Sequence, residues 1–114
     1  DNGLKLSPKA FEEAVENTPA ATLIDVRSGH EYEQKGHLKN ALVAEWGAGD
    51  FEIRLRHLDK LKPVFVYCQS GRRSSEAAEK LRELGFAKVF ELDGGIEAWS
   101  SANLPVERSL KKTK

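Results

Sequence analysis

The stretch that decides the fold is VFVYCQSGRRS, residues 64–74, in which four apolar residues run directly into a cysteine and a short polar loop. A continuous apolar run without polar alternation is typical of a strand buried on both faces of a parallel sheet. From about Arg72 to Leu84, small and apolar residues recur at helical spacing, and Gly85 stands where such a helix would end. The sequence therefore predicts a strand, a loop and a helix, with Cys68 at the carboxyl end of the strand.

The segments on either side also alternate between strands and helices. Ser7 and Pro8 predict the start of a helix that runs to about Glu16, and Ser28 with Glu31 has the spacing of a capping box. The other expected elements are strands over 22–26, 41–44 and 89–92, and helices over 30–35, 50–58 (capped by Asp50) and from about 95 to 101. Because parallel strands need crossover connections, this order predicts the α/β class, with a mostly parallel sheet and helices on both faces.

The composition fits a single domain, which we place at residues 4–108, with loose termini at 1–3 and 109–114. Lys and Arg together number 18, and Asp and Glu together also number 18, so the formal net charge is zero. This balance gives no reason to expect binding to nucleic acid or to an anionic membrane surface. No apolar run approaches the roughly 20 residues that a membrane span needs. We expect a soluble monomer without a membrane span.

The 114 residues include one cysteine and no methionine, not even at position 1. We therefore expect a processed or trimmed chain; whether a signal peptide or a further domain preceded Asp1 stays open, and so does the compartment, the cytoplasm or, after export, the periplasm. A single cysteine can form neither an internal disulfide nor a zinc site built from cysteines. We expect no metal and no cofactor.

Cys68 occupies the place where open α/β sheets bind their ligands, at the carboxyl end of a strand and next to a helix start. The loop from Gln69 to Ser74 can turn its backbone N–H groups toward the sulfur, and Gly71 relieves the crowding of such a curve. The helix dipole and the two arginines that follow add positive charge. These features favour a nucleophilic thiolate over the alternative, a buried structural cysteine.

The spacing C-x-x-G-x-R-S over residues 68–74 resembles the rhodanese family, the single-domain thiosulfate sulfurtransferases. Three further segments carry the likeness, which extends from about Leu23 to Pro105. They are LIDVR at 23–27, similar to the D-V-R strand; GHL at 36–38 before Ala41, similar to G-H-I-x-x-A; and LDGGIEAW at 92–99, similar to the closing G-G-x-x-x-W element.

This resemblance implies five parallel strands flanked by helices, and a double-displacement reaction. Cys68 would take a sulfur atom from a small anionic donor such as thiosulfate, and a thiophilic acceptor, cyanide or a thiol, would then remove it from the persulfide. The implied substrate-binding residues are Gln69, Ser70, Gly71, Arg72, Arg73 and Ser74, with Arg73 turned into the loop and Arg72 facing its mouth. The alternative is a sulfur carrier or interaction module that delivers its persulfide to a protein partner.

Phosphatases and arsenate reductases of the same fold resemble this chain but place their arginine six positions after the cysteine, where this chain has Ser74. The shorter loop makes a smaller cradle, which suits one sulfur atom better than a tetrahedral oxyanion. The chain departs from the family at 42–47, where LVAEWG replaces the usual continuation towards N-I-P. That segment lies near the cleft in the resembling fold, so the donor and acceptor preferences stay open.

Other polar and aromatic residues are expected to have structural roles. Asp25 and Arg27 would be strand-end charges that tie loops together, and His37 would pack, because a preformed thiolate requires no general base. The remaining candidates are expected to lie at the surface or to pack: His30 and His57 at the surface, Trp46 and Trp99 in packing, with Trp46 the better candidate for a cleft wall.

Overall fold

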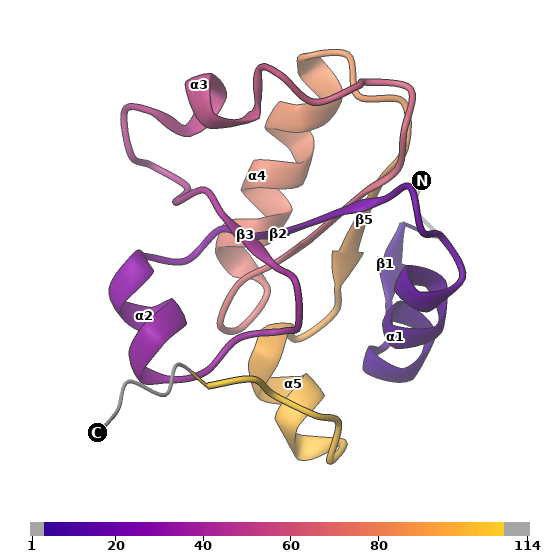
Figure 1. Ribbon diagram of the computed structural model, residues 1–114, viewed down its shortest axis with the longest axis vertical. Helices are drawn as coiled ribbons and strands as arrows, with labels where there is room; N and C mark the ends of the chain where they lie inside the picture. Colours follow the sequence, from indigo (N-terminus) through magenta and orange to yellow (C-terminus); the bar gives the residue numbers. More distant parts are fainter. Residues whose placement is uncertain (1–3, 109–114) are drawn as a thin grey trace.

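The strand Val64–Tyr67 (β4) is the central strand of a five-stranded sheet in the computed structural model, which describes residues 4–108. The strands follow the order β1-β5-β4-β2-β3, and each pairing between them is parallel (Figure 1). The other four strands are β1 (Lys5–Leu6), β2 (Thr22–Asp25), β3 (Leu42–Val43) and β5 (Val89–Leu92). The predicted parallel sheet is confirmed, with one isolated antiparallel bridge between His37 and Glu107 beside it.

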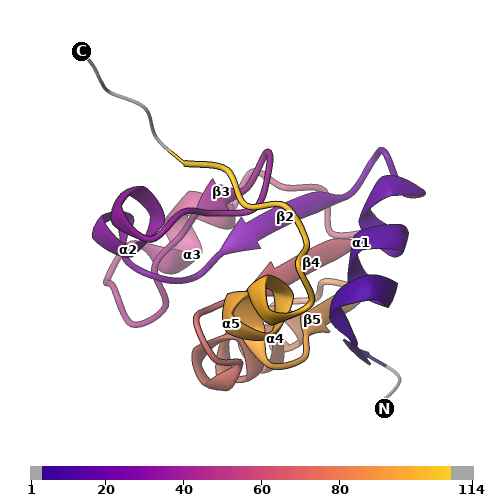
Figure 2. The ribbon, with the colours of Figure 1, turned by 90° about the horizontal axis from the view of Figure 1, so that it is seen from below.

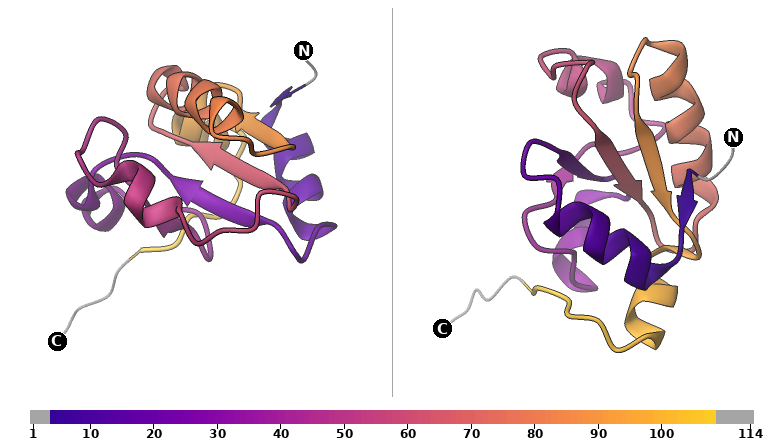
Figure 3. Two further views of the ribbon diagram at one scale, coloured as in Figure 1. Left: turned by 90° about the horizontal axis from the view of Figure 1, so that it is seen from above. Right: turned by 90° about the vertical axis from the view of Figure 1, so that its right-hand side faces the viewer.

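Helices cover both faces of this sheet, as predicted. Helices α1 (Pro8–Glu16) and α5 (Gly95–Ser101) pack on one face, and α3 (Phe51–Leu55) and α4 (Arg72–Glu83) pack on the other. The right-hand view of Figure 3 shows α1 and α4 on opposite sides of β4 and β5. The short helix α2 (Gly29–Gln34) follows β2 and lies at the opposite end of the molecule from α1 (Figure 2).

Strand β4 joins the two halves of the core because its side chains alternate between the faces. Val64 and Val66 belong to the cluster under α3 and α4, whereas Phe65 and Tyr67 belong to the cluster under α1 and α5. All four side chains are at most 2% exposed. The prediction that both faces of this strand are covered is therefore confirmed.

The two helix caps based on serine are confirmed. Ser7 Oγ accepts from the backbone N–H of Ala10 at 3.3 Å, with Pro8 at the first helical position. Ser28 and Glu31 form the reciprocal capping box of α2, in which each side chain accepts from the other residue's backbone N–H at 3.1 Å.

Two details of the sequence prediction are wrong. The helix expected over 50–58 is limited to α3, and Asp50 makes no side-chain cap, because its carboxylate accepts from Arg54 Nε at 2.8 Å instead. The pattern also missed β1, whose two residues pair with Glu91 and Leu92 at the edge of the sheet. Two residues are too few to show a strand periodicity, so only the family resemblance implied a fifth strand.

The expected loose termini at 1–3 and 109–114 lie outside the described residues. Within residues 4–108, no helix combines the length and the apolar character that crossing a membrane requires.

Candidate active site

Strand β4 carries Cys68 to the carboxyl edge of the sheet and buries it there. The backbone N–H of Val26 donates to the Tyr67 carbonyl at 3.0 Å, so pairing with the neighbouring strand continues up to the residue before the cysteine. Cys68 itself is only 1% exposed, and α4 begins four residues later at Arg72. The sulfur therefore sits between a rigid strand end and a helix N-terminus.

The loop turns hydrogen-bond donors onto the cysteine sulfur. The backbone N–H of Gly71 donates to Cys68 Sγ at 3.0 Å, and that of Ser74 donates at 3.3 Å. The thiol in turn donates to Ser74 Oγ at 3.4 Å, while this hydroxyl donates to the Gly71 carbonyl at 3.3 Å. A hydroxyl proton can rotate toward whichever acceptor needs it, so Ser74 can become a third donor when the sulfur is a thiolate.

Two glycines allow the loop to curve and to be approached closely. Gly71 has a φ of +106°, a conformation that an L side chain rarely adopts. A Cβ at Gly95 would overlap the backbone carbonyl of Gln69, and the φ of +68° there is also left-handed. This close approach lets the N-terminus of α5 hold the loop, because Ile96 N–H donates to the Cys68 carbonyl at 2.9 Å and Glu97 N–H donates to that of Gln69 at 3.1 Å.

A buried ion pair ties the loop to the rest of the sheet edge. Arg27 is fully buried and binds Asp25 through its Nη2 atom at 2.7 Å and its Nε atom at 3.0 Å. Its remaining donors reach the Gly36 carbonyl at 2.7 Å and the side-chain oxygen of Gln69 at 3.0 Å. Burial is the largest single influence on Arg27 and opposes its charge, but the hydrogen bond to Asp25 and the negative charges around it together outweigh burial and raise its pKa. The expected role of Asp25 and Arg27 in tying loops together is confirmed.

Tyr67 extends this buried network toward the 36–41 segment. Its hydroxyl donates to Asp25 Oδ2 at 2.7 Å and accepts from the backbone N–H of Leu38 at 3.0 Å. Burial, with the Asp25 charge beside it, raises the pKa of Tyr67 far above its usual value, so the hydroxyl stays protonated and remains a donor. The polar atoms beneath the loop are thus paired with one another rather than with solvent.

Arg73 does not direct its hydrogen bonds into the loop, which corrects the expectation from sequence. Its guanidinium forms a two-pronged ion pair with Glu31 of α2, with N···O distances of 2.9 and 3.0 Å. The hydrogen bond from Arg73 lowers the pKa of Glu31 to about 2, and the same bond raises the pKa of Arg73, with a smaller contribution from the nearby Cys68. The pair fastens the first turn of α4, which carries the Ser74 N–H donor, to α2.

The remaining loop residues differ in exposure. Ser70 and Arg72 are exposed, so Arg72 is free to face solvent above the loop, whereas Gln69 is half-buried between Arg27 and Glu97. The structure thus brings Gly71 and Ser74 into hydrogen-bonding distance of the Cys68 sulfur. The other predicted loop residues, Gln69, Ser70, Arg72 and Arg73, make no hydrogen bond to this sulfur among those found in the described residues.

Trp46 packs against the core cluster to which Cys68 belongs. Its ring meets Phe51 edge-on at 5.1 Å, and its indole N–H donates to Glu76 of α4 at 2.9 Å. Trp99 lies in the core of the other face. His37 stacks on Tyr32 with ring centroids 3.7 Å apart, and His30 and His57 are exposed, so the sequence predictions for the three histidines and for tryptophan packing are confirmed.

Sequence reasoning missed two supports of the loop. The Ser28–Glu31 spacing indicates only a helix cap, and nothing in a single sequence shows that Glu31 pairs with Arg73, which lies 42 positions away. The LDGGIEAW segment predicts Gly95 only as part of a family element, although two adjacent glycines at the start of a helix are a signal of close backbone approach.

Comparison with known proteins agrees with this geometry. The model of the rhodanese-like domain family matches residues 7–102 of the chain. The chain belongs to this family. The family resemblance drawn from the four sequence segments is thereby confirmed, together with the five-stranded fold that it implied.

Relatives of this rhodanese-like domain have names that refer to sulfur chemistry. The thiosulfate sulfurtransferase GlpE of Actinobacillus pleuropneumoniae serotype 7 (strain AP76) is 36% identical over 104 residues, which cover 90% of this chain and 92% of that protein. The putative sulfur carrier protein YrkF of Bacillus subtilis (strain 168) is 32% identical over 84% of this chain, which spans half the length of that relative. The polysulfide-sulfur transferase homodimer of Wolinella succinogenes has a solved structure that superposes with a TM-score of 0.78 at 33% identity, covering 95% of this chain and 80% of that one.

Proposed function

We propose that this rhodanese-like domain moves a sulfane sulfur from a small anionic donor such as thiosulfate to a thiophilic acceptor, cyanide or a thiol, through a persulfide on Cys68. The observation that carries the proposal is the convergence of two backbone N–H groups on Cys68 Sγ, at 3.0 and 3.3 Å. Donors fixed in this way stabilise negative charge without rearranging during the reaction. The similarity to a thiosulfate sulfurtransferase supports the choice of donor.

The first half-reaction is an attack by the Cys68 thiolate on the outer sulfur of thiosulfate. A sulfur–sulfur bond forms to Cys68, the sulfur–sulfur bond of the donor breaks, and its electron pair leaves with sulfite. In the second half-reaction cyanide attacks the terminal sulfur of the persulfide, thiocyanate leaves, and the thiolate is restored. The electrons and charges balance in each step, so the reaction needs no external oxidant or reductant.

The loop residues have different roles in this scheme. The amides of Gly71 and Ser74 and the Ser74 hydroxyl hold the anionic sulfur, because they already surround Cys68 Sγ. Arg72, which is exposed at the start of α4, attracts the anionic donor. Arg73 acts as a positioning residue through Glu31, since this ion pair holds the helix turn that presents Ser74.

Mass spectrometry of the intact protein tests the persulfide directly. Treatment with thiosulfate should add one sulfur atom, and cyanide should then remove it and yield thiocyanate. The Cys68→Ser variant should do neither, and no second cysteine exists to obscure the result. Thiocyanate production by the serine variant, or a wild-type protein that gains no sulfur, would refute the proposal.

A sulfur-carrier role is the second candidate, favoured by the similarity to a putative sulfur carrier protein. In this case the persulfide forms, but turnover with thiosulfate and cyanide is slow, and a protein thiol removes the sulfur faster than cyanide does. Steady-state kinetics with both kinds of acceptor separate the two roles. The monomeric state and the compartment stay predictions.

A further inference from the structure

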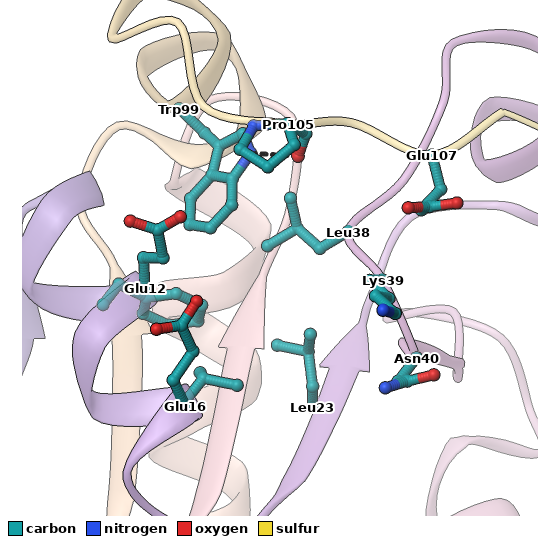
Figure 4. A pocket seen from close by; sticks show the side chains of 11 residues that line it. Glu12, Glu16, Leu23, Leu38, Lys39, Asn40, Trp99, Pro105 and Glu107 are labelled. Carbon is teal, nitrogen blue, oxygen red and sulfur yellow. Dashed lines mark hydrogen bonds between the residues drawn. The ribbon is translucent and has the colours of Figure 1, made fainter.

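A pocket of about 360 Å³ opens on the sheet face that carries α1 and α5 (Figure 4). Its floor is apolar and consists of Phe11, Leu23, Leu38 and Trp99, all members of the core cluster on that face. Cys68 belongs to the cluster on the other face, so the sheet separates this pocket from the sulfur site. The volume lies in the range of about 300–1,000 Å³ that is usual for pockets holding small molecules.

Carboxylates line the walls above this apolar floor. Glu12 and Glu16 project from α1 on one side, and Glu107 comes from the C-terminal segment on the other (Figure 4). Lys39 is the one cationic side chain among the described residues that line the pocket, so three carboxylates face one ammonium group. Such a pocket combines an apolar surface with a negative rim.

The acidic wall is unfavourable for α1 itself. Glu16 is the last residue of the helix, where the dipole favours a cation, and the last turn contains no basic residue. Glu12 and Glu16 are also four residues apart, a spacing at which like charges repel on a helix. Lys9 relieves this only in part, because it is 70% exposed and lies 3.4 Å from Glu12. Departures from local stability rules are expected at functional sites.

We propose that this pocket binds a small organic cation, whose apolar body packs on Leu23, Leu38 and Trp99 and whose ammonium group faces Glu12 and Glu16. The bound cation would relieve the repulsion between the two carboxylates and would supply the positive charge that the end of α1 lacks. An anion with an apolar body of the same size would make the same contacts with the floor, but the carboxylates of the rim would repel its charge. The site is independent of the sulfur chemistry proposed above.

Titration with n-hexylammonium at pH 7, followed by ¹⁵N–¹H correlation spectra, tests the proposal. The indole N–H of Trp99 lines the pocket and already donates to the Pro105 carbonyl at 2.8 Å, whereas Trp46 lies on the other face. The Trp99 signal should shift and saturate, and the Trp46 signal should stay in place. Hexanoate has the same chain length and the opposite charge, and its affinity should be lower by about tenfold or more.

Charge-removing variants identify the carboxylates responsible. The Glu12→Gln/Glu16→Gln double variant should weaken hexylammonium binding by about tenfold or more, since charged contacts are lost on the pocket wall. Glu13→Gln, on the same helix but outside the pocket lining, is the matched control and should bind as the wild type does. Equal binding of hexylammonium and hexanoate, shifts that never saturate, or equal effects of the control and the double variant would overturn the proposal.

Discussion

The ion pair between Glu31 and Arg73 should make the stability of the protein dependent on pH in the acidic range. The substitution Glu31→Gln tests this cleanly, because a glutamine oxygen can still accept from the Ser28 N–H and so keep the capping box. The variant loses the negative charge of the Glu31 carboxylate, whose two oxygens accept from Arg73 Nη1 at 2.9 Å and from Arg73 Nη2 at 3.0 Å. The exposed residue Glu33, two positions further along the same helix, supplies the control variant Glu33→Gln.

The magnitude follows from the acidity of the Glu31 carboxyl. The hydrogen bond from Arg73 is the main reason that its pKa falls from 4.5 to about 2, while partial burial works in the opposite direction. A shift of that size corresponds to at most about 3–4 kcal/mol of unfolding free energy. Because the Arg73 side chain is 36% exposed, solvent screening reduces this to on the order of 1–2 kcal/mol.

The sign is that of a depressed carboxylate pKa. The stabilisation is fully present above about pH 4.5, where the carboxylate would be ionised in the unfolded chain too, and it is lost as the pH falls toward 2. Urea unfolding at a series of pH values should show Glu31→Gln less stable than the wild type by on the order of 1–2 kcal/mol at pH 7. Less than about half of that difference should remain at pH 3. A difference that is constant with pH, or no larger than that of Glu33→Gln, would refute this reasoning.

Three further predictions concern the loop and its supports. In steady-state assays with cyanide, Arg73→Ala should lower kcat/KM for thiosulfate by about tenfold or more, and Arg72→Ala should lower it by less. The reason is that Arg73, unlike Arg72, joins α4 to α2 through its ion pair with Glu31. Equal effects of the two variants would count against the positioning role of Arg73. Gly95→Ala should cost at least about 2 kcal/mol in urea unfolding, because its Cβ overlaps the loop backbone, whereas Gly49→Ala, with open space around it, should be nearly neutral. Tyr67→Phe should cost about 1–3 kcal/mol in the same assay, because the Leu38 amide loses its partner and the buried Asp25 carboxylate keeps only its hydrogen bonds from Arg27; a neutral result would contradict the network.

Local sequence signals predicted most of the architecture because they are themselves physical causes of it. The apolar run at 64–67 has no polar face to expose, and a serine at the start of a helix satisfies a backbone donor, so β4 and the first two caps could be predicted from a few residues. Asp50 shows the limit of this reasoning. Its carboxylate can either cap the helix or accept a hydrogen bond from Arg54, and both are compatible with the sequence. In the structure Arg54 binds the carboxylate, and the cap does not form.

The site was predictable only as far as the chain is continuous through it. Cys68, Gly71 and Ser74 are neighbours in sequence, so their convergence on the sulfur follows from one tight turn before a helix. Arg73 illustrates the part of the site that a sequence does not predict, the contacts between residues that are distant along the chain. Its direction is set by Glu31, a residue on another helix, and a guanidinium near an anion site can equally face the anion or a distant carboxylate. Long-range pairing of this kind requires the tertiary arrangement.

The position of Arg73 changes how the loop holds a sulfur anion. If the guanidinium pointed at the sulfur, a flexible side chain would supply the charge and would have to reorganise as the sulfur changes from thiolate to persulfide. Backbone donors are instead fixed by three attachments: Arg27 to Gln69, the N-terminus of α5 to the Cys68 carbonyl, and Glu31 to the first turn of α4. None of these attachments is a hydrogen bond to the sulfur, so in the reaction proposed above the donors would keep their positions as Cys68 passes from thiolate to persulfide, which is the condition for preorganised stabilisation.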